Sequence, residues 1–375
     1  MFKYVVYLIV TLGLLINLNL KIFRSNGVYF LCVIVASILL TSLSHLDFAG
    51  GYIYQIWIVF LAFLITQFLG FEIFINIFKK YVFVLSFLSI FVFVIANYYD
   101  WILDYFPVGE NSAGIEFTNL YIGSVYKGVA EIRNASIFRE PGVFMIYILL
   151  AVMFELFISN RLNIYFLAFL FIALLTTFST AGFVILFFLI IGYMFKKDVQ
   201  NFQSNRILLA SIFAAFILIF SFQPELYDQV FSKLSSDSAS FGSATARIAS
   251  IVVNLDIFAN HPFLGSGLGN YGSLFEEYSN LYFGVPLEAS GQSTNSFMAV
   301  FATYGLLYGL IVLYALMCLT KKLSRSFILK SILFLSLGLM FSSQDMRYSL
   351  LFNILVFYGL KFSTNVFYRL FSGQN

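Results

Sequence analysis

The stretch LNIYFLAFLFIALLTTFSTAGFVILFFLIIGYMF, residues 162–195, contains no charged side chain in 34 positions. About 20 apolar residues suffice for one transmembrane helix, so this stretch is too long for a single crossing. Its centre holds the small and polar residues TTFSTAG, Thr176 to Gly182, which predict an interruption. The stretch is therefore predicted to form two membrane helices, near 162–177 and 181–195.

The same apolar character runs through the whole chain of 375 residues. Hydrophobic residues make up 61% of it and charged residues 10%, with a mean hydropathy of +0.92. A soluble domain of this length has about 25% charged residues. The composition predicts an all-α, polytopic membrane protein in which residues 1–375 form a single membrane domain. The net charge of +3 does not indicate nucleic acid binding, because the basic residues lie in short loops.

About 11 membrane helices are predicted, or 12 if the span at 52–69 continues through FEIFINIF to Lys79 and Lys80. The helices outside 162–195 are expected near residues 4–20, 27–43, 52–69, 81–97, 143–158, 206–222, 292–318, 327–342 and 348–362. No small-residue cleavage site follows the first apolar run, so the first span is expected to remain uncleaved. Cys32 and Cys318 lie inside apolar spans and indicate no disulfide or zinc framework.

The distribution of positive charge predicts the orientation of the chain. Of the 21 Lys and Arg residues, 14 fall in the loops of one side and seven in the loops of the other. Cytoplasmic loops are enriched in Lys and Arg, which assigns the first side and the C-terminus to the cytoplasm. The two longest loops, 98–142 and 223–291, then lie on the outer face and hold 13 of the 18 acidic residues. We expect the chemistry of the protein on that face.

The first outer loop ends in SIFREPGVF, residues 136–144, directly before an apolar run. Pro141 suits the first turn of a helix, and the helix dipole favours a carboxylate at Glu140. One interpretation makes Arg139 a membrane-edge side chain and Glu140 a helix-start residue. The other gives Arg139, together with Arg133, paired N–H groups that bind a lipid phosphate or diphosphate. Both interpretations stay open on these residues alone.

The second outer loop contains a predicted amphipathic helix, SATARIASIVVNLDIF, residues 243–258. Its apolar stripe comprises Ala244, Ile248, Ile251, Leu255 and Phe258. Its polar stripe comprises Ser243, Arg247, Ser250 and Asn254. We expect this helix to lie on the outer surface or to pack into it. Taken alone, the polar stripe with Arg247 is most simply a solvated face.

The turn NHPFLGSGLGNYG, residues 260–272, contains the pattern G-x-G-x-x-G, beginning at Gly267. That pattern indicates a dinucleotide site only between the strand and the helix of a βαβ unit, and the surrounding sequence predicts neither. The glycines instead predict a tight, close-packed turn that re-enters the membrane domain. His261 in this turn is more typical of a structural residue than of a catalytic one. The other histidine is His45, which excludes a histidine metal cluster.

The next span begins with STNSF, residues 293–297, and ordinary helix capping by Ser, Thr and Asn accounts for this start. Four motifs thus follow one another along the chain: FREPG (138–142), TFSTAG (177–182), NHPFLGSGLGNYG (260–272) and TNSFMAVFATYGLLYG (294–309). In this order they resemble the bacterial O-antigen polymerase and ligase superfamily, with the nearest likeness to Wzy-type polymerases of surface polysaccharides such as O-antigen or capsule. The resemblance covers roughly residues 133–310.

This resemblance implies an enzyme at the bacterial cytoplasmic (inner) membrane, with its active site facing the periplasm or exterior. Its substrates would be oligosaccharides carried on a polyprenyl diphosphate such as undecaprenyl diphosphate. A polymerase is a glycosyltransferase that moves the growing glycan from its lipid carrier to the next lipid-linked repeat unit. The family likeness further implies diphosphate binding by Arg133, Arg139 and Arg247. Membrane lipid, and a chain-length regulator and a flippase of the same pathway, would be the partners.

One position departs from the family pattern. The ligases carry a histidine, taken to activate the acceptor hydroxyl, before the asparagine at the start of the late span, whereas Thr294 precedes Asn295 here. Threonine is not a general base, so either Glu140 serves or departure of the diphosphate dominates catalysis. We therefore expect Glu140, with Arg139 and Arg247, as catalytic residues. Thr294, Asn295 and His261 are expected on the acceptor side.

A glycosyl diphosphate is already an activated donor, so no nucleotide, metal ion or other cofactor is expected. The reaction needs charge stabilisation at the departing diphosphate and a base near the attacking hydroxyl. A ligase-type transferase of the same superfamily is one alternative, and a transporter or lipid-linked sugar flippase is the other. Transporters tend to show repeated halves and charged groups near the bilayer midplane. The charges of this chain cluster in its outer loops instead, which favours an enzyme.

Overall fold

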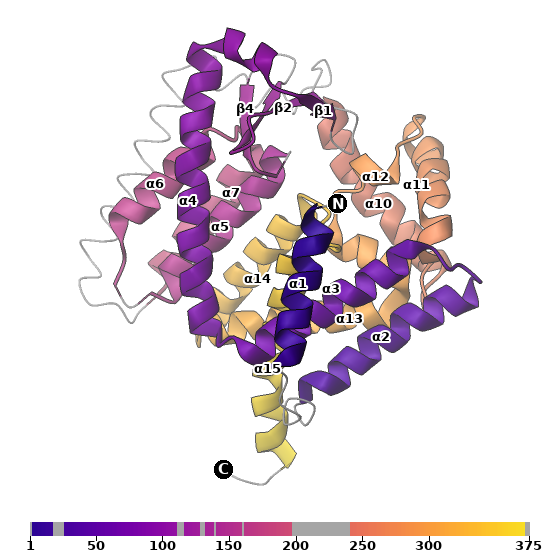
Figure 1. Ribbon diagram of the computed structural model, residues 1–375. Coiled ribbons are helices and arrows are strands. Elements are labelled where there is room, and N and C mark those ends of the chain that lie inside the picture. Colours follow the sequence, from indigo (N-terminus) through magenta and orange to yellow (C-terminus); the bar gives the residue numbers. More distant parts are fainter. Residues whose placement is uncertain are drawn as a thin grey trace. The chain divides into compact units, whose positions relative to one another are not determined.

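The computed structural model describes residues 2–17, 26–110, 116–127, 132–138, 140–159, 161–196 and 241–371, and these are mostly helical (Figure 1). Within this part of the chain, four helices are long and apolar enough to cross a membrane: Gly27–Ser44, Gly50–Phe68, Phe71–Tyr98 and Ser296–Leu323. Shorter apolar helices of 10–17 residues accompany them. These helices support the predicted multi-pass membrane protein. The number of crossings and their orientation stay predictions.

The chain forms two compact units, which are described one at a time. The first unit comprises residues 1–74, 249–325 and 345–375, and the second comprises 75–248 and 326–344. Two helices, α4 and α10, contribute residues to both units. The single membrane domain predicted for residues 1–375 stays a prediction.

The first unit is built around α13, a long apolar helix that packs against α15 and α2. Its helices are α1 (Phe2–Ile16), α2 (Asn26–Ser44), α3 (Gly50–Phe68), the greater part of α10 (Phe241–Asn260), α11 (Gly267–Phe283), α12 (Ala289–Gln292), α13 (Ser296–Leu323) and α15 (Leu350–Phe371). Helix α15 also contacts α3, and α11 contacts α13. Gly359 permits the close approach of α15 to α13, because a Cβ there would collide with the backbone of Ala315.

Helix α13 is kinked at Gly305, whose φ of 79° lies in the left-handed region that favours glycine. The turn that follows α10 lies against this kink. The N–H of Leu306 donates to the carbonyl of Pro262 at 2.8 Å, and the N–H of Ser266 donates to the carbonyl of Ala302 at 2.8 Å. The turn therefore pairs backbone groups on both sides of the kink.

Glycine is required on both sides of this contact. A Cβ at Gly305 would collide with the carbonyl of Phe263, and a Cβ at Gly265, where φ is +67°, would collide with the backbone of Thr303. The tight, close-packed turn predicted from the glycines is confirmed.

The pattern G-x-G-x-x-G opens helix α11, and the element before it is helix α10. Groups of the chain itself occupy the N-terminus of α11. The N–H of Gly269 donates to Oδ2 of Asp47 at 2.6 Å, and the N–H of Leu268 donates to the hydroxyl of Tyr52 at 2.7 Å. An aspartate thus lies where a nucleotide phosphate would have to bind.

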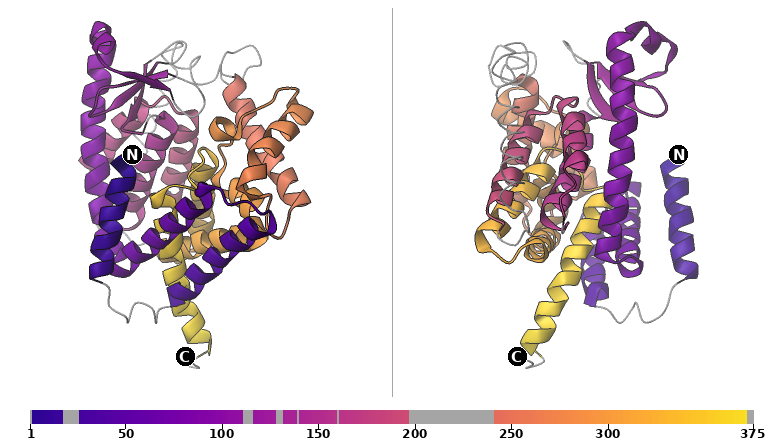
Figure 2. Two further views of the ribbon diagram at one scale, coloured as in Figure 1. Left: turned by 45° about the vertical axis from the view of Figure 1, so that its right-hand side comes forward. Right: turned by 90° about the vertical axis from the view of Figure 1, so that its left-hand side faces the viewer.

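The second unit combines apolar helices with a small sheet. Its elements are α4 (Phe71–Tyr98) from residue 75 onward, a 3-10 helix (Asp100–Tyr105), β1 (Val108–Glu110), β2 (Glu116–Asn119), β3 (Ser124–Lys127), β4 (Ile132–Ser136), α5 (Pro141–Phe157), α6 (Ile164–Leu175), α7 (Thr180–Met194) and α14 (Phe327–Ser342). Helix α7 packs against α14 and α5, and α5 packs against α6. Figure 2 shows α4 as a long helix with the sheet beside its C-terminal end.

The prediction of an all-α chain is wrong for the first outer loop. Strands β1 to β4 form an antiparallel sheet in which each strand pairs with the next. Its apolar side chains pack on α4 in a cluster that comprises Val92, Ala96, Leu103, Leu120 and Val125. The strands have three to five residues. Runs this short show too little alternation to be told from irregular loop by sequence alone.

Most predicted helix positions agree with the structure. TTFSTAG does divide the 34-residue stretch: α6 ends at Leu175, and α7 follows Ser179, whose hydroxyl accepts the N–H of Gly182. FEIFINIF begins α4 and runs without a break through Lys79 and Lys80. It therefore does not continue the span at 52–69, and the twelfth helix suggested there is not present. The span predicted at 206–222 lies outside the described residues.

Candidate functional site

The N-terminus of α13 is held by hydrogen bonds from its own cap and from α10. Asn295 is the N-cap, and its side chain accepts the N–H of Met298 at 3.1 Å. The predicted capping role of this segment is thus confirmed at Asn295. The hydroxyl of Ser250 accepts the N–H groups of both Thr294 and Asn295, each at 2.9 Å. The hydroxyl of Thr294 is buried and has no hydrogen-bond partner among the described residues.

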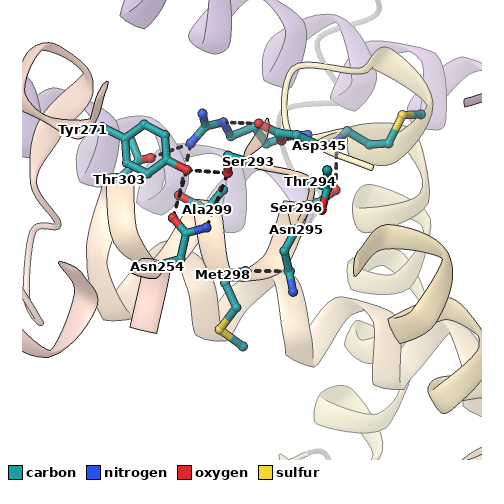
Figure 3. A network of polar contacts seen from close by, with 12 residues as sticks. Asn254, Tyr271, Ser293, Thr294, Asn295, Ser296, Met298, Ala299, Thr303 and Asp345 are labelled. Atoms are coloured by element: carbon teal, nitrogen blue, oxygen red, sulfur yellow. Dashed lines mark hydrogen bonds and ion pairs between the residues drawn. The ribbon is translucent and has the colours of Figure 1, made fainter. Parts of the chain in front are cut away.

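A second set of contacts joins α10, α11 and the segment before α13. The hydroxyl of Tyr271 donates to Oδ1 of Asn254 at 2.9 Å and lies 2.6 Å from the hydroxyl of Ser293. Figure 3 shows these three side chains meeting beside the start of α13. Asn254 is fully buried, and Tyr271 and Ser293 are nearly so. Such a buried polar cluster is stable because its members satisfy one another.

The polar stripe of α10 is buried and much of its apolar stripe is exposed, which is the opposite of a helix with a solvated polar face. Ser250 and Asn254 are fully buried, whereas Ile248, Ile251 and Leu255 are 57%, 41% and 45% exposed. The polar stripe faces inward because the segment 293–295 and Tyr271 supply its hydrogen bonds. The expectation of a solvated polar face is therefore wrong for Ser250 and Asn254.

The loop between α14 and α15 adds a buried ion pair to this cluster. Nε of Arg347 lies 3.0 Å from Oδ2 of Asp345, and Nη1 donates to the hydroxyl of Thr303 at 2.6 Å and to the carbonyl of Ala299 at 3.3 Å. The guanidinium also lies over the ring of Tyr271, 4.5 Å from its centroid. Arg347 is 5% exposed. The cluster thus combines a carboxylate, a guanidinium and a tyrosine.

The same loop is attached directly to α13. The hydroxyl of Ser296 accepts the N–H of Met346 at 2.8 Å, which fixes Met346 beside the first turn of the helix. Asp345 precedes Met346, so its carboxylate is held near the segment that contains Thr294 and Asn295. Its side chain keeps 20% of its surface exposed, so it is accessible to a small polar group.

Burial changes the acid–base properties of this cluster. Desolvation raises the pKa of Asp345 above its usual value, against the opposing effect of Arg347. Desolvation likewise raises the pKa of Tyr271, which therefore stays protonated. Burial favours the neutral form of an acid, and a cation beside a carboxylate favours its ionised form. Asp345 is thus a carboxylate with a raised pKa, which is suited to accepting a proton.

The residues predicted from the first outer loop lie in the second unit. Arg133, in β4, donates from Nε to the carbonyl of Thr177 at 3.0 Å and lies 5.9 Å from the ring centroid of Tyr126. Glu140 is the N-cap residue of α5, without a side-chain capping hydrogen bond, and Pro141 occupies the first turn as predicted. Arg139 lies outside the described residues.

Arg247 lies in the second turn of α10, and His261 directly follows the helix. Arg247 is partly buried, which lowers the pKa of its guanidinium. The ring centroids of His261 and His45 are 6.3 Å apart. His261 follows Ser250 by 11 positions, or about 16 Å of helix at 1.5 Å per residue. Ser250 thus contacts the consecutive residues Thr294 and Asn295, and His261 lies about three helical turns further along the chain.

Sequence reasoning did not identify Tyr271, Asp345 or Arg347 as site residues. Arg347 was recognisable as a basic residue on the predicted outer side, in the sequence SSQDMRYSL between two apolar spans. The charged residues Asp345 and Arg347, between two late apolar spans, could have indicated a functional site. Nothing in the sequence indicated that Asp345 and Arg347 meet Tyr271, which is more than 70 positions away.

A comparison with protein families adds a finding about this region. Residues 164–314 match the family model of the O-antigen ligase. The matched segment is therefore similar to the O-antigen ligase family. The match supports the O-antigen polymerase and ligase superfamily, as the four motifs predict. No curated protein and no solved structure matches the chain significantly.

The segment that matches the O-antigen ligase model contains most of the cluster described above. It includes α10, α11 and most of α13, with Ser250, Asn254, Tyr271 and Asn295. Asp345 and Arg347 follow the matched segment and complete the cluster from the loop before α15. Among the described residues no group of three His, Cys, Asp or Glu side chains is arranged to hold a metal ion.

Proposed function

We propose that the protein is a polysaccharide polymerase of the O-antigen type. It transfers a growing glycan from polyprenyl diphosphate to the next lipid-linked repeat unit at the outer face of the cytoplasmic membrane. The match of residues 164–314 to the O-antigen ligase model supports a glycan transferase that acts on a lipid-linked oligosaccharide. The observation that carries the proposal is the Asp345–Arg347 ion pair beside the start of α13. Asp345 can act as a general base, whereas Thr294 cannot.

In this proposal the acceptor sugar binds near the start of α13. The Thr294 hydroxyl has no partner among the described residues and is available to a sugar hydroxyl. Asp345 accepts the proton of the attacking hydroxyl, and its raised pKa improves it as a base. Arg347 holds the carboxylate in place from its buried side. Glu140, the base expected from the sequence, is the second candidate for the same role.

The donor diphosphate is assigned to arginines of the outer loops. Arg139 and Arg247 bind the departing diphosphate and stabilise its charge as the bond to the glycan breaks. Arg133 assists in binding. A guanidinium presents paired N–H donors that match phosphate oxygens, which supports arginine in this role. No nucleotide or metal ion takes part in the proposed reaction.

The proposal includes the topology inferred from the charge distribution. About 11 membrane helices cross the inner membrane, loops 98–142 and 223–291 face the periplasm or exterior, and the C-terminus is cytoplasmic. His261 is left out of the proposed acceptor site, because it lies about 16 Å along α10 from Ser250, which contacts Thr294 and Asn295. A chain-length regulator and a flippase of the same pathway are proposed partners.

Reconstitution tests this function. The purified protein, placed in liposomes with a lipid-linked repeat unit, is expected to produce a ladder of glycans that remain attached to the polyprenyl carrier. In cells, deletion of the gene is expected to leave single repeat units at the outer face or on their final anchor. A ligase would instead attach preformed glycan to a lipid acceptor without lengthening it. Accumulation of repeat units on the cytoplasmic face would identify a flippase and contradict the proposal.

A further inference from the structure

We propose that a pocket in the second unit binds an anionic phospholipid. The pocket has a volume of about 1050 Å³ and lies between the first half of α4 and the segment from the end of α5 to the middle of α6. It is independent of the proposed polymerase activity. Its lining combines a cationic end with an aromatic surface, which is the arrangement that a phosphate headgroup and an acyl chain require together.

The carboxylate of the pocket is already neutralised by the protein. Glu155 is 3% exposed, and its Oε2 lies 2.9 Å from Nζ of Lys79 and accepts the hydroxyl of Ser159 at 2.8 Å. Its Oε1 accepts the N–H of Asn163 at 2.7 Å. A buried carboxylate with three donors has no need of a further cation. Lys79 is likewise committed to Glu155 and Ser159.

Two cations of the pocket remain available to a ligand. Lys80 and Arg161 both line it and are exposed, and within the described part of the chain neither forms an ion pair. With Glu155 balanced by Lys79, the pocket carries a surplus of two positive charges. Water screens exposed cations unless an anion binds them, and a phosphate diester suits both a lysine and an arginine.

The rest of the pocket is apolar and aromatic. Phe83 lies one helical turn beyond Lys79 and Lys80 on α4, and its ring centroid is 4.8 Å from that of Phe169 and 6.0 Å from that of Phe166. Both partners belong to α6. The cations and the aromatic surface therefore follow one another along α4. A free phosphate ion would contact only the cations, whereas a phospholipid would contact the cations through its headgroup and the aromatic surface through its acyl chains.

The position of the pocket along α4 fits the edge of a bilayer. The 18 residues of α4 that follow Lys80 span about 27 Å at 1.5 Å per residue, close to the hydrocarbon thickness of a membrane. Lys80 then lies at the depth of the headgroups. The charge distribution assigns this end to the cytoplasmic leaflet, where anionic lipids attract clustered Lys and Arg side chains.

Native mass spectrometry of the purified full-length protein tests this inference. Phosphatidylglycerol is expected to bind more tightly than phosphatidylcholine, and inorganic phosphate at millimolar concentration should not displace it. Each neutralised cation is expected to weaken binding of phosphatidylglycerol about fivefold. The double variant Lys80→Gln/Arg161→Gln should therefore lose about 25-fold in affinity for this lipid and little for phosphatidylcholine. Lys80→Arg/Arg161→Lys should retain it.

The control is Lys321→Gln/Lys322→Gln, which removes two adjacent cations at the end of α13. This variant is expected to change the affinity for phosphatidylglycerol less than twofold. Phe83→Ala/Phe169→Ala should weaken both lipids. Unfolding temperatures in detergent should match those of the wild type for the Gln variants, because Lys80 and Arg161 are exposed. Equal binding of the two lipids, full displacement by phosphate, or tighter binding of polyprenyl phosphate than of phosphatidylglycerol would each overturn the inference.

Discussion

The guanidinium of Arg347 lies between the carboxylate of Asp345, at 3.0 Å, and the ring of Tyr271, at 4.5 Å from its centroid. Burying a guanidinium is costly unless it is paired and its N–H groups are bonded. Here Asp345 supplies the opposite charge, and the hydroxyl of Thr303 and the carbonyl of Ala299 accept hydrogen bonds from Nη1. The hydroxyl of Tyr271 also donates to Asn254. The Tyr271 side chain therefore connects the loop before α15 to α10.

Arg347→Ala should therefore destabilise the fold strongly. It leaves the Asp345 carboxylate without its cation and opens a cavity beside Tyr271, and the loss of one partner from a buried pair costs about 3–5 kcal/mol. Thermal unfolding of the detergent-purified protein measures this effect. Arg325→Ala is the matched control, because Arg325 is exposed, and it should change stability by less than about 0.5 kcal/mol. Equal stability of the two variants would contradict the structural role of Arg347.

Asp345→Asn distinguishes the two candidate bases. The amide keeps the shape of the side chain but cannot accept a proton, so elongation should slow about 10²- to 10⁴-fold per molecule of folded protein. The amount of folded protein is measured alongside, because the variant also leaves the buried Arg347 without its counter-charge. Glu140→Gln should then retain most activity, since a helix-start residue tolerates the amide. Glu277→Gln, an exposed carboxylate of α11, is the control and should be silent. If instead Glu140→Gln slows elongation and Asp345→Asn does not, Glu140 is the base.

The pH dependence of the rate provides an independent check on Asp345. A base works in its deprotonated form, and burial raises the pKa of Asp345. Activity should therefore fall on acidification at a higher pH than an ordinary aspartate would give, and it should be fully present above that range. The initial rate of elongation against pH measures this limb. Asp345→Asn should abolish the limb along with most of the rate, and a limb that survives in this variant must come from another group.

Gly305→Ala should disrupt the kink of α13. Its φ of 79° is strained for alanine, at about 1–3 kcal/mol, and the new Cβ collides with the carbonyl of Phe263. Gly338→Ala is the matched control, because this glycine lies inside α14 with open space around its Cβ position. That change should be neutral or stabilising by up to about 1 kcal/mol. Unfolding temperatures of the two variants compare them directly.

Arg139→Lys and Arg247→Lys test the donor site. Lysine keeps the charge and the membrane-edge position but loses the paired donors. A diphosphate-binding arginine predicts a rate loss of about 10²- to 10³-fold at normal protein levels, as for other lost transition-state donors. A membrane-edge arginine predicts wild-type elongation. If both variants elongate at the wild-type rate, neither arginine stabilises the leaving diphosphate.

Cysteine labelling tests the orientation. Cysteines introduced at Asn111 and Ser238 should react with an impermeant reagent added outside the cell, and a cysteine at Gln200 should not. The native Cys32 is exposed, so the labelling is best done after Cys32→Ser. Reaction at Gln200 with protection at Ser238 would invert the orientation and exclude an outward-facing active site.

The membrane character of the chain and most of its helices followed from the sequence. Runs of about 20 apolar residues have few structures open to them in a bilayer, because every backbone group must be paired within the segment. The break at TTFSTAG and the start of α5 at Pro141 were also predictable, since small polar residues and proline act on the local backbone. The glycines of residues 260–272 predicted a close-packed turn for the same local reason.

The candidate site depended on contacts between distant segments. Helical periodicity identified the two stripes of α10, but the sequence did not indicate that Ser250 and Asn254 face inward, because their hydrogen-bond partners lie about 40 positions away. The partnership of Asp345 with Arg347 beside Tyr271 was equally hidden. Hydropathy and local propensity determined which segments form helices. Only the tertiary structure decided which polar groups are buried together, since a buried polar side chain is stable just where the fold supplies its partner.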